Sequence, residues 1–262
     1  MKKDINDILD PFHKEDLANP VHPSVYIDDE NYKFLILRLP SINDRNDIVM
    51  VSRGFVFFEE DIYQYDKKLQ KLVKLGNNWH AFYLYLDEII DDALGLSSRM
   101  NDEVIDMEER LYRQKIPNDL LSSWFSHRSY LIRMNRVMRR TIDIYEKFYT
   151  KNKQSFEAFI HNFDDLSEHL LRSQRYIEHS IEKLNSIYSF YSAINNDKMN
   201  RSVYLLTIIS AVFLPLNLAV GFFGMNTGSL PFTSDGGTLK VVMLLSSISI
   251  VLVLFLLYRK QK

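Results

Sequence analysis

The 262-residue sequence contains no cysteine, and it has only eight glycines and seven prolines. The absence of cysteine excludes disulfide bonds and thiolate metal sites, and it is compatible with a reducing compartment. No histidines have the spacing of a catalytic zinc motif, and neither a P-loop nor a GxGxxG sequence occurs. We therefore expect neither an enzyme nor an organic cofactor.

Charge is scarce in the C-terminal part of the chain. Beyond residue 201, the charged side chains are Asp235, Lys240, Arg259, Lys260 and Lys262. Residues 202–223 and 241–258 carry no charge, and each stretch is long enough to cross about 30 Å of hydrocarbon as an α-helix. We expect two membrane spans.

The flanking charges predict the orientation of these spans. Lys198 and Arg201 precede the first span, and the basic residues 259–262 follow the second. By the positive-inside rule, both termini are cytoplasmic and the loop of residues 224–240 lies outside. The N-terminus has no apolar run typical of a signal peptide. A multi-pass protein of the bacterial inner membrane is expected.

The charged part of the chain predicts an α+β fold that is mainly α. Residues 1–77 contain short β-like runs, two of them separated at Arg53-Gly54, and predict a small α/β cytoplasmic subdomain. Residues 78–163 have helical periodicity and predict a cytoplasmic helical subdomain.

A stalk helix is predicted over residues 164–201. Its seam recurs at steps of three and four, at Leu166, Leu170, Ser173, Ile177, Ile181, Leu184, Ile187, Tyr191 and Ile194. No glycine or proline interrupts the pattern before Pro215, so we expect one helix that continues into the first span. A helix of roughly 90 Å, at 1.5 Å per residue, implies packing partners, either copies of the chain or neighbouring elements.

A second periodicity lies within the first span. Mostly small or polar residues share one helical face, at Asn200, Val203, Thr207, Ser210, Leu214, Asn217, Gly221 and Gly224. Such a face packs against another helix, or it lines an aqueous pore at an oligomer axis, where Leu206 joins Val203 and Leu214 in narrowing the passage. Periodicity leaves both interpretations open. Gly221, Gly224 and Asn226 also suit a simple helix C-cap.

The outer end of the first span reads Gly224-Met225-Asn226, and a short loop, a second span and a basic tail follow. This pattern, from about Asp164 to the end of the chain, resembles the CorA family of divalent-cation channels, the 2-TM-GxN proteins, whose sister branch ZntB handles zinc. The resemblance implies a funnel-shaped homopentamer with the first spans around the pore. It also implies that Gly224, Met225 and Asn226 form the outer selectivity ring, and that the face described above, with Leu206, lines the path inward.

The resemblance implies Mg²⁺, and with it Co²⁺, as the transported ion, driven by the membrane potential. Neutral oxygens from Gly224 and Asn226 suit an ion that gives up its water reluctantly. Asn217 and Phe232 stand where the magnesium branch usually has threonine and an acidic residue. A ZntB-like zinc transporter, with or without proton coupling, is therefore the alternative, and a non-conducting coiled-coil scaffold is a more distant one.

Acidic residues near the start of the stalk are candidate regulatory ligands. The resemblance implies that Asp165 is a regulatory metal ligand between subunits, and His169 follows it by four residues. A helix-capping role for Asp165 is the alternative. Asp87, Glu88, Asp91 and Asp92 form a further acidic patch, which is interpreted as a solvated helix face.

Residues 127–140 carry five arginines, of which Arg133, Arg136 and Arg140 share a helical face. Contact with nucleic acid or lipid would explain them. A solvated face paired with neighbouring acids is the favoured interpretation, and no nucleic-acid partner is expected.

Overall fold

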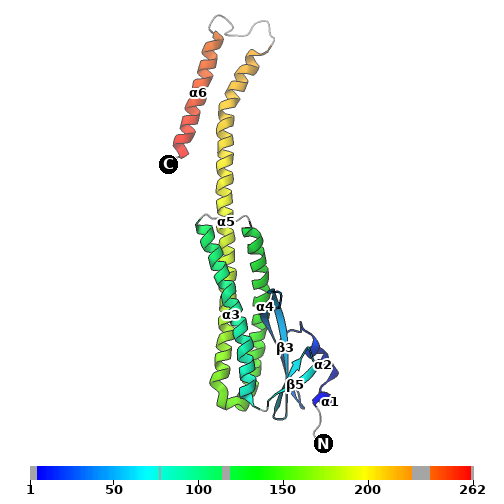
Figure 1. The fold of residues 1–262 in the computed structure, drawn as a ribbon. Helices are drawn as coiled ribbons and strands as arrows, with labels where there is room; N and C mark the ends of the chain where they lie inside the picture. Colours follow the sequence, from blue (N-terminus) through cyan, green and yellow to red (C-terminus); the bar gives the residue numbers. More distant parts are fainter. Residues whose placement is uncertain (1–4, 77, 114–118, 226–236, 261–262) are drawn as a thin grey trace. The chain divides into compact units, whose positions relative to one another are not determined.

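The computed structural model describes residues 5–76, 78–113, 119–225 and 237–260 (Figure 1). Its contacts divide the chain into two units, Met1–Tyr188 and Ser189–Lys262. Helix α5, Ile160–Phe223, begins in the first unit and ends in the second, which also contains helix α6, Gly237–Lys260.

The first unit contains a five-stranded antiparallel sheet in which each strand pairs with the next. The strands are β1 (Val25–Asp28), β2 (Lys33–Ile42), β3 (Ile48–Phe58), β4 (Asp61–Asp66) and β5 (Lys71–Gly76). A small sheet subdomain at the N-terminus of a mainly helical chain was expected, and this part of the prediction is confirmed.

The break predicted at Arg53-Gly54 is wrong, because β3 continues through both residues. Gly54 pairs with Ile36 in β2, and the buried side chain of Leu17 packs directly onto it. A Cβ atom at Gly54 would lie 2.1 Å from Leu17 Cδ2. The glycine therefore allows a close approach to the sheet and does not mark a turn.

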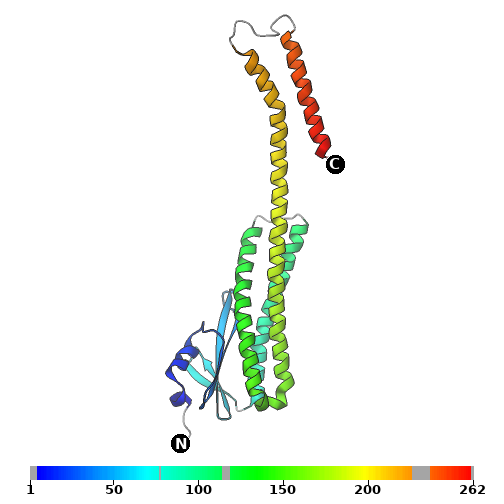
Figure 2. The ribbon, with the colours of Figure 1, turned by 180° about the vertical axis from the view of Figure 1, so that it is seen from behind.

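Helices cover both faces of the sheet (Figures 1 and 2). The short helices α1 (Ile5–Ile8) and α2 (Pro11–Ala18) pack on one face. Their apolar side chains form a cluster with those of the strands, comprising Ile5, Leu9, Leu17, Tyr32, Phe34, Ile36 and Val56. Helices α3 (Trp79–Tyr112) and α4 (Leu120–Asn152) lie on the other face.

Aromatic side chains join the sheet to the helices. Phe57 of β3 contacts Trp79 and Phe82 of α3 and Phe148 of α4, with ring centroids 5.1–5.5 Å apart. A 3-10 helix, η1 (Lys153–Phe159), follows α4 directly and leads into α5. Trp79 also contacts Phe163 near the start of α5, so these aromatic side chains hold the starts of α3 and α5 against the end of α4.

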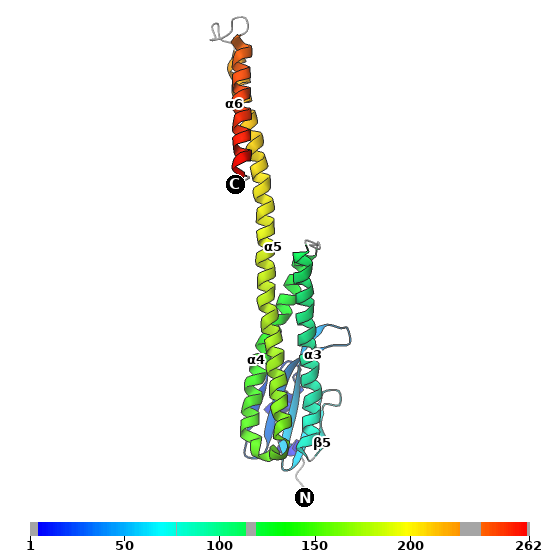
Figure 3. The same cartoon turned by 90° about the vertical axis from the view of Figure 1, so that its left-hand side faces the viewer.

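In the first unit, α3, α4 and the N-terminal part of α5 run side by side (Figure 3). The predicted stalk seam faces inward here, and its buried members are Leu166, Leu170, Ser173, Ile177, Leu184 and Ile187. The Ser173 hydroxyl lies 2.6 Å from that of Ser97 in α3, and Trp124 Nε1 of α4 donates to the Leu184 carbonyl at 2.7 Å. Over this stretch the packing partners of the seam belong to the same chain.

Candidate functional site

The predicted pore-lining face of α5 is exposed along its length. Val203, Leu206 and Leu214 are 57%, 63% and 68% exposed. The remaining predicted pore-lining positions are exposed as well, at Asn200, Thr207, Ser210, Asn217 and Gly221. The Thr207 hydroxyl donates to the Val203 carbonyl at 2.9 Å, so it is satisfied within the helix. Within the described part of the chain, no residue buries this face between residues 200 and 221.

Another face of the same segment is less exposed, at Tyr204, Ile208, Ala211 and Pro215. At 3.6 residues per turn, it is rotated by about 100° from the predicted pore-lining face.

Among the described residues, one helix qualifies as a membrane span by length and composition, and its most apolar window has a mean hydropathy of 2.2 with no buried residue. The second predicted span, residues 241–258, lies within α6.

The C-terminal end of α5 depends on a glycine. The Gly224 amide donates to the Val220 carbonyl at 2.8 Å, and a Cβ atom at Gly224 would lie 2.9 Å from that same oxygen. Because the close contact is with backbone, any other residue would displace the turn. Met225 follows and is 55% exposed, whereas Asn226 lies outside the described residues. Gly224 thus ends the helix in a tight turn.

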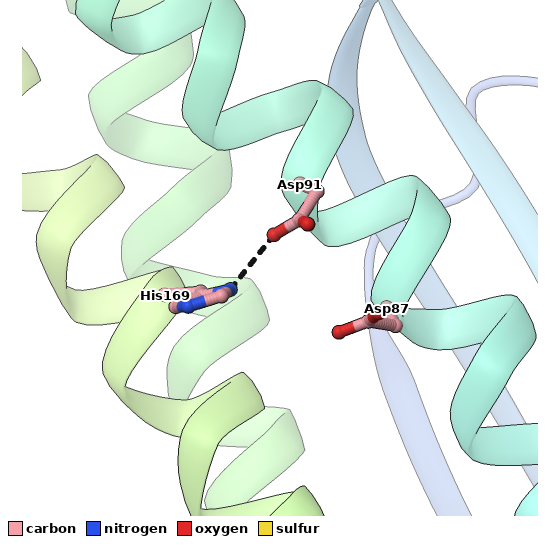
Figure 4. A group of neighbouring side chains, drawn as sticks. All are labelled: Asp87, Asp91 and His169. Carbon is pink, nitrogen blue, oxygen red and sulfur yellow. Dashed lines mark hydrogen bonds and ion pairs between the residues drawn. The ribbon is translucent and has the colours of Figure 1, made fainter.

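A second group of candidate ligands lies in the first unit, between α3 and α5 (Figure 4). Asp87 and Asp91 are one turn apart on α3, and they point toward His169 of α5. The ligand atoms of these three residues lie within 4.8 Å of one another. His169 Nδ1 is 2.7 Å from an Asp91 oxygen. Asp165, one turn before His169, lies 3.6 Å from its Nε2 atom.

This group can coordinate a divalent cation. Two carboxylates and an imidazole supply oxygen and nitrogen ligands, a set that suits Zn²⁺ or Co²⁺ as well as a partly hydrated Mg²⁺. The hydroxyl of Tyr83 donates to Asp87 at 3.2 Å and orients that carboxylate. The His169 side chain is 19% exposed, whereas those of Asp91 and Asp165 are about half exposed, so an ion could enter from solvent.

The sequence predicted Asp165 and His169 as candidate ligands on one helix, but it did not predict that Asp87 and Asp91 lie beside His169. Asp87 and Asp91 were interpreted as part of a solvated face, yet both face His169. Their four-residue spacing matches that of Asp165 and His169, and this was the available signal. The capping alternative for Asp165 is wrong, because α5 begins at Ile160 and Asp165 lies within the helix.

The arginines of α4 are paired with acids in only one case among the described residues. Arg139 Nη2 lies 2.8 Å from a Glu178 oxygen. Arg128 instead stacks over Trp124, and Arg140 donates to the Ser24 carbonyl. The favoured interpretation of a solvated face is confirmed, because four of the five arginines, all but Arg128, are exposed. The expected pairing with acids is found among the described residues for Arg139 alone.

Comparisons with known proteins agree on one family. The chain is 28% identical to the zinc transport protein ZntB of Yersinia enterocolitica over 58% of this chain and 47% of that protein. It is 21% identical to the cobalt/magnesium transport protein CorA of Thermotoga maritima, over 97% of this chain and 76% of that protein. The chain spans about half the length of the ZntB relatives that it matches.

Solved structures share the fold at low sequence identity. The complete structure of the CorA magnesium transporter from Methanocaldococcus jannaschii matches with a TM-score of 0.73 and 17% identity, covering 98% of this chain and 84% of that one. The family model of the CorA-like Mg²⁺ transporter protein matches residues 8–260. Because that match covers nearly the whole sequence, the chain belongs to the CorA-like Mg²⁺ transporter family.

Proposed function

We propose that the protein is a divalent-cation channel that mediates uptake of Mg²⁺, and of Co²⁺, driven by the membrane potential. The observation that carries the proposal is the face of α5 from Asn200 to Gly221, which contains most of the span's polar side chains and is uncovered in the single chain. Polar side chains facing lipid are costly, so several copies would turn this face toward a shared aqueous axis. The assembly proposed is a homopentamer with both termini in the cytoplasm.

The outer turn supplies the proposed selectivity. Gly224 brings the backbone close to the axis, and its carbonyl together with the Asn226 side chain offers uncharged oxygens. Repeated around the axis, such oxygens accept hydrogen bonds from the water shell of Mg²⁺, which that ion gives up reluctantly. A ring of uncharged oxygens also holds the ion weakly enough to let it leave. Further inside, Leu214, Leu206 and Val203 form an apolar constriction.

We propose that the group between α3 and α5 is a regulatory metal site. Asp165 and His169 were expected to take part, and Asp91 and Asp87 complete the set of ligands. A bound cation would neutralise three carboxylates and hold α3 against α5, which continues toward the pore. Loss of the cation would leave the carboxylates to repel one another. Cytoplasmic Mg²⁺ would thereby limit its own uptake.

Zinc transport of the ZntB type is the second candidate, with or without coupling to protons. His169 favours it, because imidazole is a better ligand for zinc than for magnesium. The similarity to several ZntB sequences adds support. Flux into liposomes, measured in parallel for Mg²⁺, Co²⁺ and Zn²⁺, distinguishes the candidates. Flux of zinc alone would reject the magnesium assignment, and proton co-transport would appear as acidification.

Substitution of the outer turn tests conduction itself. We expect Gly224→Ala and Asn226→Ala to abolish Mg²⁺ flux while the oligomer still assembles. The matched control is Gly95→Ala, since a Cβ atom at Gly95 meets no atom within 4 Å. The readouts are liposome flux and the oligomer size in detergent. If both outer-turn variants conducted like the wild type, the outer turn would not be the selectivity ring, whereas a wild-type protein without flux would be a non-conducting scaffold.

A further inference from the structure

Charge is segregated between the two helices that flank α5 in the first unit. Helix α3 carries nine aspartates and glutamates against two arginines. Helix α4 carries seven arginines and lysines against two acids. Figure 3 shows these helices on opposite sides of the N-terminal part of α5. The first unit therefore has an acidic flank and a basic flank.

Many acidic side chains of α3 gather on the side of the helix that points away from the core. Four of them, called the acidic face below, are exposed and lie on one side of the helix: Glu88, Asp92, Asp102 and Asp106, with Arg99 among them. Asp106 pairs with an arginine of the same helix at 2.6 Å, whereas no ion pair within the described ranges includes the other three acids. Most of this negative charge is therefore not balanced within the chain.

The basic side chains of α4 gather in the same way. The basic face comprises four exposed side chains, Arg133, Arg136, Arg140 and Lys147, with Asp143 among them. Of the ion pairs between described residues, none includes a member of this face. Phe125 and Ile132 are exposed on the same side of α4 and add apolar surface. Each face thus presents the charge that the other lacks.

The two helices run antiparallel, and their contacts fix which residues lie level with one another. The start of α3 packs against the end of α4, and nearer the other end Glu103 Oε2 lies 2.9 Å from His127 Nε2. At 1.5 Å per residue, Asp102 and Ser129 are therefore at about the same level along the helices. A rotation about an axis along the helices keeps these levels from one copy of the chain to the next.

We propose that the basic face of one copy docks on the acidic face of the next copy around a ring. This contact rests on the proposed homopentamer, and it names the surfaces that join adjacent first units. Two acidic or two basic faces repel each other, so the contact joins unlike faces, and contacts of that kind close into rings. By the same levels, Arg136 comes within about 3 Å of Asp92 along the axis.

Many weak interactions together stabilise the proposed contact. Each exposed ion pair contributes little by itself, so the pairs select the face and the register more than they set the affinity. Burial of Phe125 and Ile132 adds an apolar contribution. Because the charges are exposed, added salt should weaken the contact.

The absence of cysteine allows the contact to be tested by cross-linking in the full-length protein. Chains carrying Asp102→Cys and chains carrying Ser129→Cys, each with its own affinity tag, are co-expressed and treated with a short bifunctional maleimide. We expect covalent dimers that contain one chain of each variant, and none when either variant is expressed alone. Dimers of a single variant would show that a face meets its own copy, and they would overturn the proposal.

The size of the oligomer is measured on the same samples. An intact oligomer without mixed dimers would overturn this contact alone, and it would leave the basic face to another anionic partner such as lipid. A monomeric chain would reject the proposed homopentamer and this contact with it.

Charge reversal tests whether complementary charge forms the contact. Arg136→Glu in the Ser129→Cys chain should lower the yield of mixed dimers about fivefold. Adding Asp92→Arg to the Asp102→Cys chain should restore the yield. Arg45→Glu, the same charge change in the exposed turn between β2 and β3, should leave the yield unchanged. Equal yields with both glutamate variants, or no rescue by the second reversal, would contradict the proposal.

Discussion

Single side chains on α3 and α5 set the proposed regulation. Asp91 contacts His169 directly, and Asp165 lies on the other side of the same imidazole. The four-residue spacing of Asp87 and Asp91, and of Asp165 and His169, is visible in the sequence. The meeting of the pairs is not, because 78 residues separate Asp91 from His169 and only tertiary packing brings them together.

Removal of one ligand tests the metal site. We expect Asp91→Asn or His169→Gln to weaken Co²⁺ binding by about tenfold or more, since even outer-shell changes at metal sites cost that much. The measurement is calorimetric titration together with the visible absorption of bound Co²⁺. Asp92→Asn, an exposed neighbour with the same charge change, is the control. Unchanged Co²⁺ binding in both ligand variants would exclude this site.

Tyr149 of α4 links stability to alkaline pH. Burial raises its pKa to about 12, and the hydrogen bond to Asp164 and the charge of Asp164 add to the effect. In the unfolded chain, tyrosine loses its proton near pH 10, whereas the folded protein keeps it until about pH 12. The free energy of unfolding should therefore fall as the pH rises from about 10 to 12.

The variant Tyr149→Phe isolates this contribution. It should lower stability at neutral pH, and its decline between about pH 10 and 12 should be shallower than that of the wild type. Thermal unfolding across this pH range gives both slopes. Parallel slopes would show that Tyr149 titrates alike in the folded and unfolded chains.

At the scale of elements, periodicity predicted the helices better than the strands. The stalk seam from Leu166 to Ile187 is buried as its spacing indicates. The continuity of β3 could not be predicted, because Gly54 resembles a turn signal unless the position of α2 is known. Strands β4 and β5 were not predicted, since their residues are largely polar and half-exposed and carry little alternation.

The contact between α2 and β3 makes a prediction for Gly54. We expect Gly54→Ala to destabilise the protein by about 1–3 kcal/mol, because the new methyl group forces the buried Leu17 to move. Gly95→Ala, on an exposed helical position of α3, should instead stabilise by about 0.5–1 kcal/mol. Thermal unfolding of the two variants is compared directly. An unchanged midpoint for Gly54→Ala would show that α2 can shift without cost.

At the scale of the whole molecule, family membership follows from the match over residues 8–260. The sequence predicted it from a short motif after an apolar helix, because an uncharged glycine- and asparagine-bearing turn at that place is unusual. The number of subunits in the assembly cannot be derived in the same way. The exposed face of α5 offers a surface for other copies, but subunit number depends on contacts that one chain does not contain.

The central claim is that the polar face of α5 surrounds a water-filled axis, and the absence of cysteine permits a direct test. Asn217→Cys places a thiol on that face, and Leu216→Cys places one about 100° away around the helix. Mg²⁺ flux into liposomes is measured before and after treatment with a charged thiol reagent. We predict that the reagent blocks Asn217→Cys and leaves Leu216→Cys conducting. Block of Leu216→Cys alone, or of neither variant, would contradict the account.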